Sequence, residues 1–308
     1  MYVGRYAPSP TGDLHLGNAR TALIAWLWAR RAGGRFLLRF EDLDTARVRP
    51  GCARAQADSL AWLGLDWDAE PVAQSQRGEL YDAALATLRD RGFLYECFCS
   101  RADVRRAGSA PHGPDGPLYA GVCRDLSPDG RAARVALGRA PSLRVRMEGE
   151  VEFRDDLMGP QRELLEATTG DIVVRRSDGV IAYQLAVVAD DAEQGVTHVV
   201  RGADLLASTA RQIRLYRLLG LAPVPGFAHV PLLLGDDGDR LAKRHGAVGL
   251  TELRETGADP RAIVGRLAFS AGLLEAPEPC TPAALLERFD PAVLQREATR
   301  IDPASLRW

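Results

Sequence analysis

The sequence predicts an α/β protein built on a parallel sheet, with an insertion in the middle of the chain and a small helical module in its last part. A strand–helix–strand pattern opens the chain, which is typical of a βαβ unit and therefore of parallel strands. A stretch rich in Gly, Pro and Arg interrupts this pattern over residues 93–160. After residue 246, proline-initiated helix starts replace it.

The first half of the sheet is predicted within residues 1–92. Residues 2–6 form a strand, and the turn-rich loop APSPTGDLHLG follows it. The next segment carries apolar residues at helical spacing and ends at Gly33 and Gly34, which predicts a helix. FLLRF, residues 36–40, is then expected to be a strand that runs into Glu41.

The second half of the sheet is predicted within residues 161–246. DIVVRR (171–176) and VIAYQLAVV (180–188) are expected to form a hairpin-like pair around the turn at 177–179. VTHVVR (196–201) is expected to be a buried strand, residues 208–219 a helix, and AHVPLLL (228–234) another strand. Residues 247–308 form the helical module, whose starts are marked by the pairs Asp259-Pro260, Thr281-Pro282, Asp290-Pro291 and Asp302-Pro303.

The bulk composition is that of an ordinary globular protein, with 46% hydrophobic and 26% charged residues in 308. A net charge of -2 argues against a large basic platform that coats nucleic acid. The chain contains no apolar run long enough to span a membrane, and its N-terminus lacks a secretory signal. We therefore expect a cytoplasmic protein, and we expect a monomer because nothing in the composition suggests a self-associating surface.

Two residue types occur only once. Of the 39 basic residues all but Lys243 are arginine, and Asn18 is the only asparagine. A biased composition alone can produce such single residues. Both nevertheless fall inside the two motifs described next, which favours a functional reason for keeping them.

The first motif is PSPTGDLHLGNA, residues 8–19, between the first strand and the first helix. Open α/β sheets bind nucleotides at this point, where the helix dipole favours negative charge. Gly12 and Gly17 allow close backbone approach, and His15 can donate a hydrogen bond to a phosphate. An isolated His-x-Gly is more often a tight loop with a capping histidine, so the surrounding residues decide.

Those surrounding residues resemble a known family. RYAPSPTGDLHLGNARTAL (5–23) resembles the HIGH-motif segment of glutamyl-tRNA synthetases almost position for position, and FLLRFEDLDTAR (36–47) resembles the strand that follows it. The resemblance implies the Rossmann-like catalytic domain of class I aminoacyl-tRNA synthetases, which uses ATP with Mg²⁺.

The second motif, LLLGDDGDRLAKRHGAV (232–248), resembles the KMSKS loop of the same family. Arg240 replaces the first lysine of the family pattern and Ala242 the first serine, whereas Lys243 keeps the second lysine. A lysine there offers a mobile point charge to the phosphates. The resemblance thus implies catalytic roles for His15, Gly17 and Lys243, and an ATP site formed by Pro8, Gly12, His15, Gly17, Asn18, Arg240, Leu241 and Lys243.

A dicarboxylic amino acid needs cationic anchors for its carboxylates and an acidic or polar group for its ammonium. The bidentate fork of arginine suits a carboxylate, and an acid suits the ammonium group. By the resemblance, the L-glutamate contacts are Arg5, Ser9, Glu41, Tyr183 and Arg201. Surface ion pairs are the alternative, since an arginine-rich chain forms many.

Cys97, Cys99 and Cys123 lie in a C-x-C…C pattern that suits tetrahedral Zn²⁺, which needs a fourth ligand in a structural site. On chemistry alone His112 is the better candidate. The resemblance favours Tyr119, because a C-x-C…Y-x-x-x-C pattern marks the short glutamyl-tRNA synthetase paralogues, and we choose Tyr119. Cys52 and Cys280 are expected to be ordinary small hydrophobes.

The short paralogues with this plan are the glutamyl-queuosine tRNA(Asp) synthetases. The resemblance implies that glutamate is activated with ATP and joined to the queuosine base in the anticodon loop of tRNA(Asp). It also implies that the chain has no anticodon-binding domain. The alternatives are a truncated glutamyl-tRNA synthetase that charges the 3′ end of tRNA(Glu), and a non-catalytic synthetase-like RNA-binding module.

Overall fold

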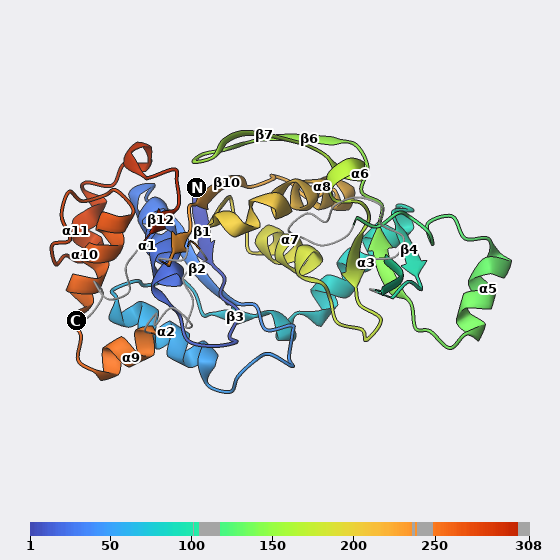
Figure 1. Cartoon of the computed structure of the whole chain (residues 1–308), viewed down its shortest axis with the longest axis horizontal. Helices are drawn as coiled ribbons and strands as arrows, with labels where there is room; N and C mark the ends of the chain where they lie inside the picture. The colour runs from blue at the N-terminus through green and yellow to red at the C-terminus, as the bar shows by residue number, and fades with distance from the viewer. Residues whose placement is uncertain (101, 105–117, 236–237, 239–248, 301–308) are drawn as a thin grey trace.

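The computed structural model describes residues 1–100, 102–104, 118–235, 238 and 249–300. Figure 1 shows an elongated molecule, with the C-terminal helices at one end, the sheet in the middle and α5 at the other end. The α-helices are α1 (Leu16–Arg31), α2 (Cys52–Trp62), α3 (Gly78–Asp90), α5 (Pro128–Ala136), α6 (Leu165–Thr168), α7 (Tyr183–Glu193), α8 (Thr209–Leu219), α9 (Leu250–Glu255), α10 (Pro260–Ser270) and α11 (Pro282–Leu286).

The strands fall into four groups of hydrogen-bonded neighbours, in the orders β1-β2-β3, β7-β6-β10-β9, β4-β5-β8 and β11-β12. Their bounds are β1 (Val3–Tyr6), β2 (Arg35–Phe40), β3 (Val72–Ala73), β4 (Leu94–Cys97), β5 (Ser142–Val145), β6 (Glu150–Asp155), β7 (Gly159–Leu164), β8 (Ile172–Arg175), β9 (His198–Gly202), β10 (Gly226–Val230), β11 (Leu233–Leu234) and β12 (Thr299–Arg300).

The predicted βαβ unit is confirmed. β1 pairs with β2 in parallel, and α1 connects them. α1 buries apolar residues around most of its circumference because it packs against the sheet and also against α10 and α11. Gly34 is required after this helix, because a Cβ there would lie 2.3 Å from the carbonyl oxygen of Tyr2.

The parallel sheet continues through β9 and β10, which pair in parallel along their full length. The backbone N–H of Thr197 donates to the Val3 carbonyl at 2.9 Å, which brings the start of β9 beside β1. The predicted strand at 196–201 and the helix at 208–219 are therefore confirmed, as β9 and α8. The predicted strand at 228–234 is divided into β10 and β11.

The expected hairpin at 171–188 is half wrong. The turn exists, because Arg175 bridges Ile181 and the Arg176 N–H donates to Val180 O. From Tyr183 onward, however, the chain is the helix α7. A short apolar run is compatible with a strand or with a buried helix. α7 is a buried helix, in which every residue from Leu185 to Asp191 is buried.

Antiparallel strands lie in the predicted insertion and directly after it. β6 and β7 form a hairpin, and β4, β5 and β8 form a small sheet. β6 also joins the parallel sheet, where Asp155 lies opposite Phe227 of β10. The boundaries 1–92, 93–160, 161–246 and 247–308 stay a prediction.

In the last part of the described chain, α10 and α11 begin where two of the proline pairs predict, whereas α9 begins at Leu250 without such a pair. Asp259 accepts a hydrogen bond from the Arg261 N–H at the start of α10, and Thr281 caps α11 in the same manner. Asp290-Pro291 starts only a 3₁₀ turn, Pro291–Val293. Asp302-Pro303 lies outside the described residues. In the part of the chain that the structure describes, we find no helix with both the length and the apolar character needed to cross a membrane.

Candidate active site and metal centre

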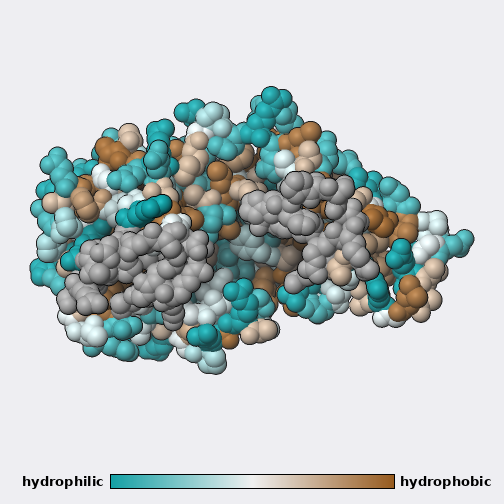
Figure 2. All heavy atoms as spheres, in the orientation of Figure 1, coloured by the Kyte–Doolittle hydropathy of each residue, from teal (hydrophilic) through white to brown (hydrophobic). Residues whose placement is uncertain are grey.

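A cavity of about 350 Å³ opens at the carboxyl ends of β1 and β9 and at the N-terminus of α1. This is the place where open α/β sheets bind ligands. Hydrophilic and hydrophobic residues are intermingled over the face of the molecule seen in Figure 2. The cavity is lined by Arg5, Tyr6, Ala7, Pro8, Ser9, His15, Gly17, Asn18, Thr21, Glu41, Tyr183, Val200, Arg201, Gly202, Asp204, Leu205, Pro231, Leu232 and Leu233.

His15 is the N-cap of α1. Its Nδ1 accepts from the backbone N–H groups of Gly17 at 3.1 Å and Asn18 at 3.4 Å, and the Asn18 side chain accepts from the His15 N–H in return. Because Nδ1 is an acceptor, the proton of the neutral ring is on Nε2, which makes Nε2 a donor. His15 can therefore cap α1 through Nδ1 and at the same time donate a hydrogen bond to a phosphate through Nε2.

The loop before α1 is hydrogen-bonded to a residue of α2. Gln56 donates from Nε2 to the carbonyl oxygens of Ser9 and Gly12, at 3.1 and 2.7 Å. Pro8 and Ser9 of this loop line the cavity. Gly12 is not among the residues that line the cavity, and its close approach to a phosphate stays a prediction.

Within the second motif, the structure describes residues 232–235 and 238. Leu232 and Leu233, at the start of the motif, line the cavity, and Gly249, directly after the motif, forms an antiparallel bridge with His15. Asp13 accepts from the backbone N–H and the hydroxyl of Thr251, at 3.0 and 2.8 Å. Arg240, Leu241 and Lys243 lie outside the described residues.

Arg5 reaches the cavity from the end of β1. Its guanidinium donates to both carboxylate oxygens of Asp191, from Nε at 3.2 Å and from Nη2 at 3.3 Å. Arg39 of β2 donates to the same carboxylate from Nη1 at 2.8 Å, and it also lies 3.4 Å from Glu41 Oε1. One buried carboxylate therefore orients two arginines.

Arg201 reaches the cavity from β9, and its guanidinium donates hydrogen bonds to neutral groups. Its Nε donates to His229 Nε2 at 3.0 Å and its Nη1 to Gln212 Oε1 at 2.8 Å. Its Nη2 donates to Thr209 Oγ1 at 2.9 Å and to the Leu205 carbonyl at 3.3 Å. Arg201 is thus held in place by hydrogen bonds to neutral groups, whereas Arg5 forms an ion pair with Asp191.

Burial shifts the pKa values of the groups at the cavity wall toward their neutral forms. Burial raises the pKa of Glu41, which Arg39 opposes. It raises the pKa of Tyr183 and lowers the pKa of Arg201. A wall that presents the guanidinium groups of Arg5 and Arg201 and the buried carboxyl group of Glu41 is suited to a zwitterion with an additional carboxylate.

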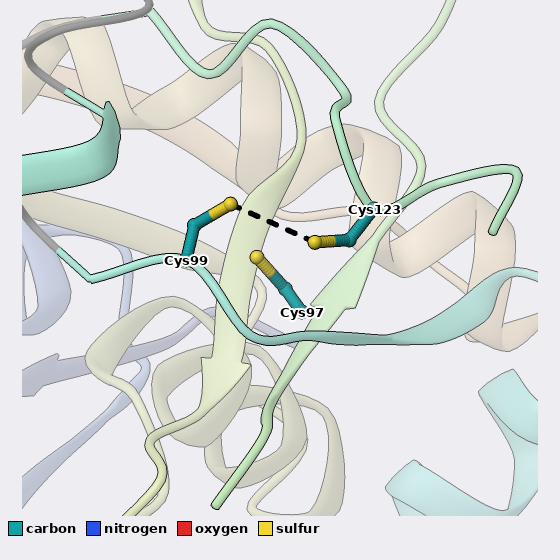
Figure 3. Close-up of side chains that lie close together, drawn as sticks. All are labelled: Cys97, Cys99 and Cys123. Atoms are coloured by element: carbon teal, nitrogen blue, oxygen red, sulfur yellow. Dashed lines mark hydrogen bonds between the residues drawn. The ribbon is translucent and has the colours of Figure 1, made fainter. Parts of the chain in front are cut away.

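The cysteine cluster lies at the edge of the small antiparallel sheet, away from this cavity. The sulfur atoms of Cys97, Cys99 and Cys123 point toward one another and lie within 4.8 Å of one another (Figure 3). Cys99 Sγ and Cys123 Sγ are 3.6 Å apart. Tetrahedral zinc with Zn–S bonds of about 2.3 Å separates its sulfur ligands by about 3.8 Å, so the three thiols can hold a metal ion.

The hydroxyl of Tyr119 lies beside this cluster. Its hydroxyl lies 3.3 Å from Cys97 Sγ and 4.0 Å from Cys99 Sγ, and the guanidinium of Arg144 stacks on its ring. Burial and the neighbouring thiols raise the pKa of Cys99 to about 12. A bound cation would relieve this by stabilising the thiolates. His112 lies outside the described residues.

The sequence reasoning missed the residues behind the cavity wall. Asp191 and Arg39 are buried, and so are His229, Gln212 and Thr209. A charged residue within an apolar run indicates a buried ion pair. Arg39 in FLLRF and Asp191 in LAVVADDA are such residues. His229 in FAHVPLLL carries this signal less clearly.

Comparisons with known proteins agree with this geometry. The family described as "tRNA synthetases class I (E and Q), catalytic domain" matches residues 2–308. A "Glutamyl-Q tRNA(Asp) synthetase" from Symbiobacterium thermophilum is 56% identical over 98% of this chain and 96% of its own length. A "Glutamate--tRNA ligase" from Oleidesulfovibrio alaskensis is 43% identical over 99% of this chain and 65% of its own length.

A solved structure of a glutamate-tRNA synthetase from Elizabethkingia anophelis superimposes with a TM-score of 0.83 at 26% identity. The match covers 97% of this chain and 68% of that chain. The predicted class I synthetase fold is therefore confirmed. The chain belongs to the class I tRNA synthetases (E and Q), a family of ligases, and within it to the group of relatives named glutamyl-Q tRNA(Asp) synthetase.

Proposed function

We propose that this protein activates L-glutamate with ATP and transfers the glutamyl group to the queuosine base in the anticodon of tRNA(Asp). The observation that carries the proposal is the cavity in which Arg5, Arg201 and Glu41 lie beside the His15-capped start of α1. The name of the Symbiobacterium thermophilum relative supports the acceptor.

Activation requires an α-carboxylate oxygen of glutamate to attack the α-phosphorus of ATP. The bond from this phosphorus to the bridging oxygen then breaks, and pyrophosphate leaves. We assign His15, Gly17 and Lys243 to this step, with Pro8, Gly12, Asn18, Arg240 and Leu241 as further ATP contacts. Mg²⁺ accompanies ATP and offsets phosphate charge when bound. The protein needs no covalent intermediate, so its contribution is positioning and charge stabilisation.

The amino acid is assigned to the part of the cavity that residues at the ends of β1, β2, β9 and α7 line. Arg201 is the anchor for the side-chain carboxylate, because its neutral partners leave its positive charge available to an anion. Arg5 contributes a second guanidinium, and Glu41 accepts the ammonium group of the substrate. Ser9 and Tyr183 complete the set as hydrogen-bonding groups. A neutral side chain such as that of glutamine would leave the charge of Arg201 uncompensated in a buried place.

In the second step, a hydroxyl of the queuosine cyclopentene-diol attacks the acyl carbon of the glutamyl-adenylate. The acyl–phosphate bond breaks, AMP leaves, and the hydroxyl proton is released. We propose that the metal is structural Zn²⁺, held by Cys97, Cys99, Tyr119 and Cys123. It takes no part in either step. We further propose a cytoplasmic monomer.

Two assays test the function. Glutamate-dependent exchange of labelled pyrophosphate into ATP, measured without RNA, should be positive, and its absence with and without tRNA would reject the enzyme. Labelled glutamate should then be transferred to queuosine-containing tRNA(Asp), and not to queuosine-free tRNA(Asp) or to tRNA(Glu). Charging of tRNA(Glu) at its 3′ end would instead establish the alternative of an ordinary glutamyl-tRNA synthetase.

A further inference from the structure

His229 lies behind Arg201 and connects it to a buried carboxylate. Its Nδ1 lies 2.5 Å from Asp155 Oδ2, and its Nε2 lies 3.0 Å from Arg201 Nε. The side chains of His229 and Asp155 are both fully buried. The three residues belong to β6, β9 and β10, neighbouring strands of one sheet.

The direction of the hydrogen bonds fixes which ring nitrogen carries the proton. Arg201 Nε is always a donor, so His229 Nε2 must be an acceptor. The hydroxyl of Thr209 lies 3.2 Å from the same Nε2 and accepts from Arg201 Nη2, so it can donate its own proton to the ring. The single proton of the neutral imidazole is therefore on Nδ1, where it is donated to Asp155.

Asp155 is itself held in place. Its Oδ1 accepts from the backbone N–H groups of Leu157, Met158 and His229, at 3.0, 2.8 and 3.2 Å. Oδ2 remains for the imidazole. A carboxylate saturated in this way stays ionised and has one acceptor aimed at Nδ1.

From these contacts we propose that His229 is a positioning residue for Arg201, kept by Asp155 in the tautomer whose Nε2 can only accept. This inference rests on the proposed function, since it concerns how the glutamate anchor is set. A carboxylate in the place of the ring would orient Arg201 equally well but would neutralise it. The neutral imidazole of His229 orients the guanidinium of Arg201 and leaves the positive charge of Arg201 for the substrate. The carboxylate of Asp155 is separated from Arg201 by the width of the imidazole ring.

The sharpest variant is Asp155→Asn, which preserves size and the Oδ1 contacts. Its amide would donate to His229 Nδ1, so the ring proton would move to Nε2 and face the Nε–H of Arg201. A carboxylate-to-amide change next to a functional histidine selects the wrong tautomer in this way in serine proteases. We expect the KM for glutamate to rise about tenfold or more, with the KM for ATP nearly unchanged.

Two further variants separate positioning from packing. His229→Gln places a carboxamide oxygen near the position of Nε2 and should preserve most of the glutamate affinity, whereas His229→Leu should lose it. His198→Gln is the matched control, because His198 stacks on Tyr2 outside the cavity and should leave both KM values unchanged. Equal increases of both KM values together with a lower melting temperature in Asp155→Asn would show a merely structural role and overturn the inference.

The tautomer can be read directly. In ¹⁵N-detected imidazole spectra, His229, identified by its loss in His229→Gln, should show a protonated Nδ1 and an unprotonated Nε2, and Asp155→Asn should invert this pattern. A wild-type ring protonated on Nε2 would overturn the inference. Because the spectrum needs no substrate, it tests the tautomer even if wild-type protein fails the exchange assay, a failure that would count against the proposed function alone.

Discussion

The carboxylate of Asp191 on α7 binds the guanidinium of Arg5 on β1 through two hydrogen bonds, at 3.2 and 3.3 Å, with both side chains at most 5% exposed. The pair joins residues 186 positions apart and sets the direction of Arg5 at the cavity wall. Arg39 shares the carboxylate, so Asp191 supports two buried cations at once.

Replacing Asp191 with alanine should therefore damage both stability and activity. The change leaves Arg5 and Arg39 buried without their shared partner, which costs about 3–5 kcal/mol of unfolding free energy for a broken buried pair. Glutamate-dependent pyrophosphate exchange should fall as well. Urea unfolding followed by circular dichroism, together with the exchange assay, measures both effects.

Glu150→Gln is the control for this variant, because Glu150 forms an exposed ion pair with Arg162. Exposed pairs contribute little to stability, so this change should leave the unfolding curve in place. An Asp191→Ala protein as stable and as active as wild type would contradict the prediction.

His15 should separate helix capping from catalysis. His15→Asn keeps a good N-cap for α1 but removes the ring, so activity should fall with little loss of stability. His15→Ala removes the cap too and should lose an additional ~1 kcal/mol of unfolding free energy. Thermal unfolding and the exchange rate measured on both variants test this. Equal melting temperatures for the two variants would argue against the capping role.

Glu41 should show a conflict between stability and function. Burial raises its pKa. An acid whose pKa is higher in the folded than in the unfolded state stabilises the fold fully at pH values below its unfolded-state pKa. This stabilisation is lost as the pH rises through the folded-state pKa. Charged Glu41 is therefore unfavourable for folding at neutral pH.

Glu41→Gln should accordingly be no less stable than wild type at pH 7, and the difference between the two proteins should shrink as the pH falls toward about 4.3. Activation of glutamate should be lost. Urea unfolding at several pH values measures the first effect and the exchange assay the second. A variant that is less stable than wild type at pH 7 would show that the ion pair with Arg39 outweighs burial.

The cysteine cluster predicts that the purified protein contains bound zinc. Cys99→Ser and Cys123→Ser should lose bound zinc and melt at a lower temperature, because structural zinc sites contribute folding free energy. Cys52→Ser and Cys280→Ser are matched controls, since these cysteines lie outside the cluster and should leave one zinc bound.

Tyr119→Phe tests the fourth ligand. The ring and its stacking with Arg144 remain, and only the hydroxyl that lies 3.3 Å from Cys97 Sγ is removed. Zinc should be lost to a competing chelator at a lower chelator concentration than in wild type. Unchanged retention of the metal would point to a different fourth ligand.

The sequence by itself determined the βαβ opening and the cysteine cluster, because each depends on a local pattern. Arg5 and Arg201 were predicted from the resemblance to glutamyl-tRNA synthetases, and the structure places both at the cavity wall with His15. The sequence could not determine that residues 183–193 form a helix, since a short apolar run buried on all sides has no periodicity that separates helix from strand.

Only the tertiary structure decided how the two site arginines differ. Arg5 is compensated by Asp191 from α7, whereas Arg201 is held by His229 and other neutral groups. Arg5 is 186 positions away from its partner and Arg201 is 28 positions away. Nothing in the local sequence brings these groups together; the order of the strands and the packing of α7 and α8 against them do.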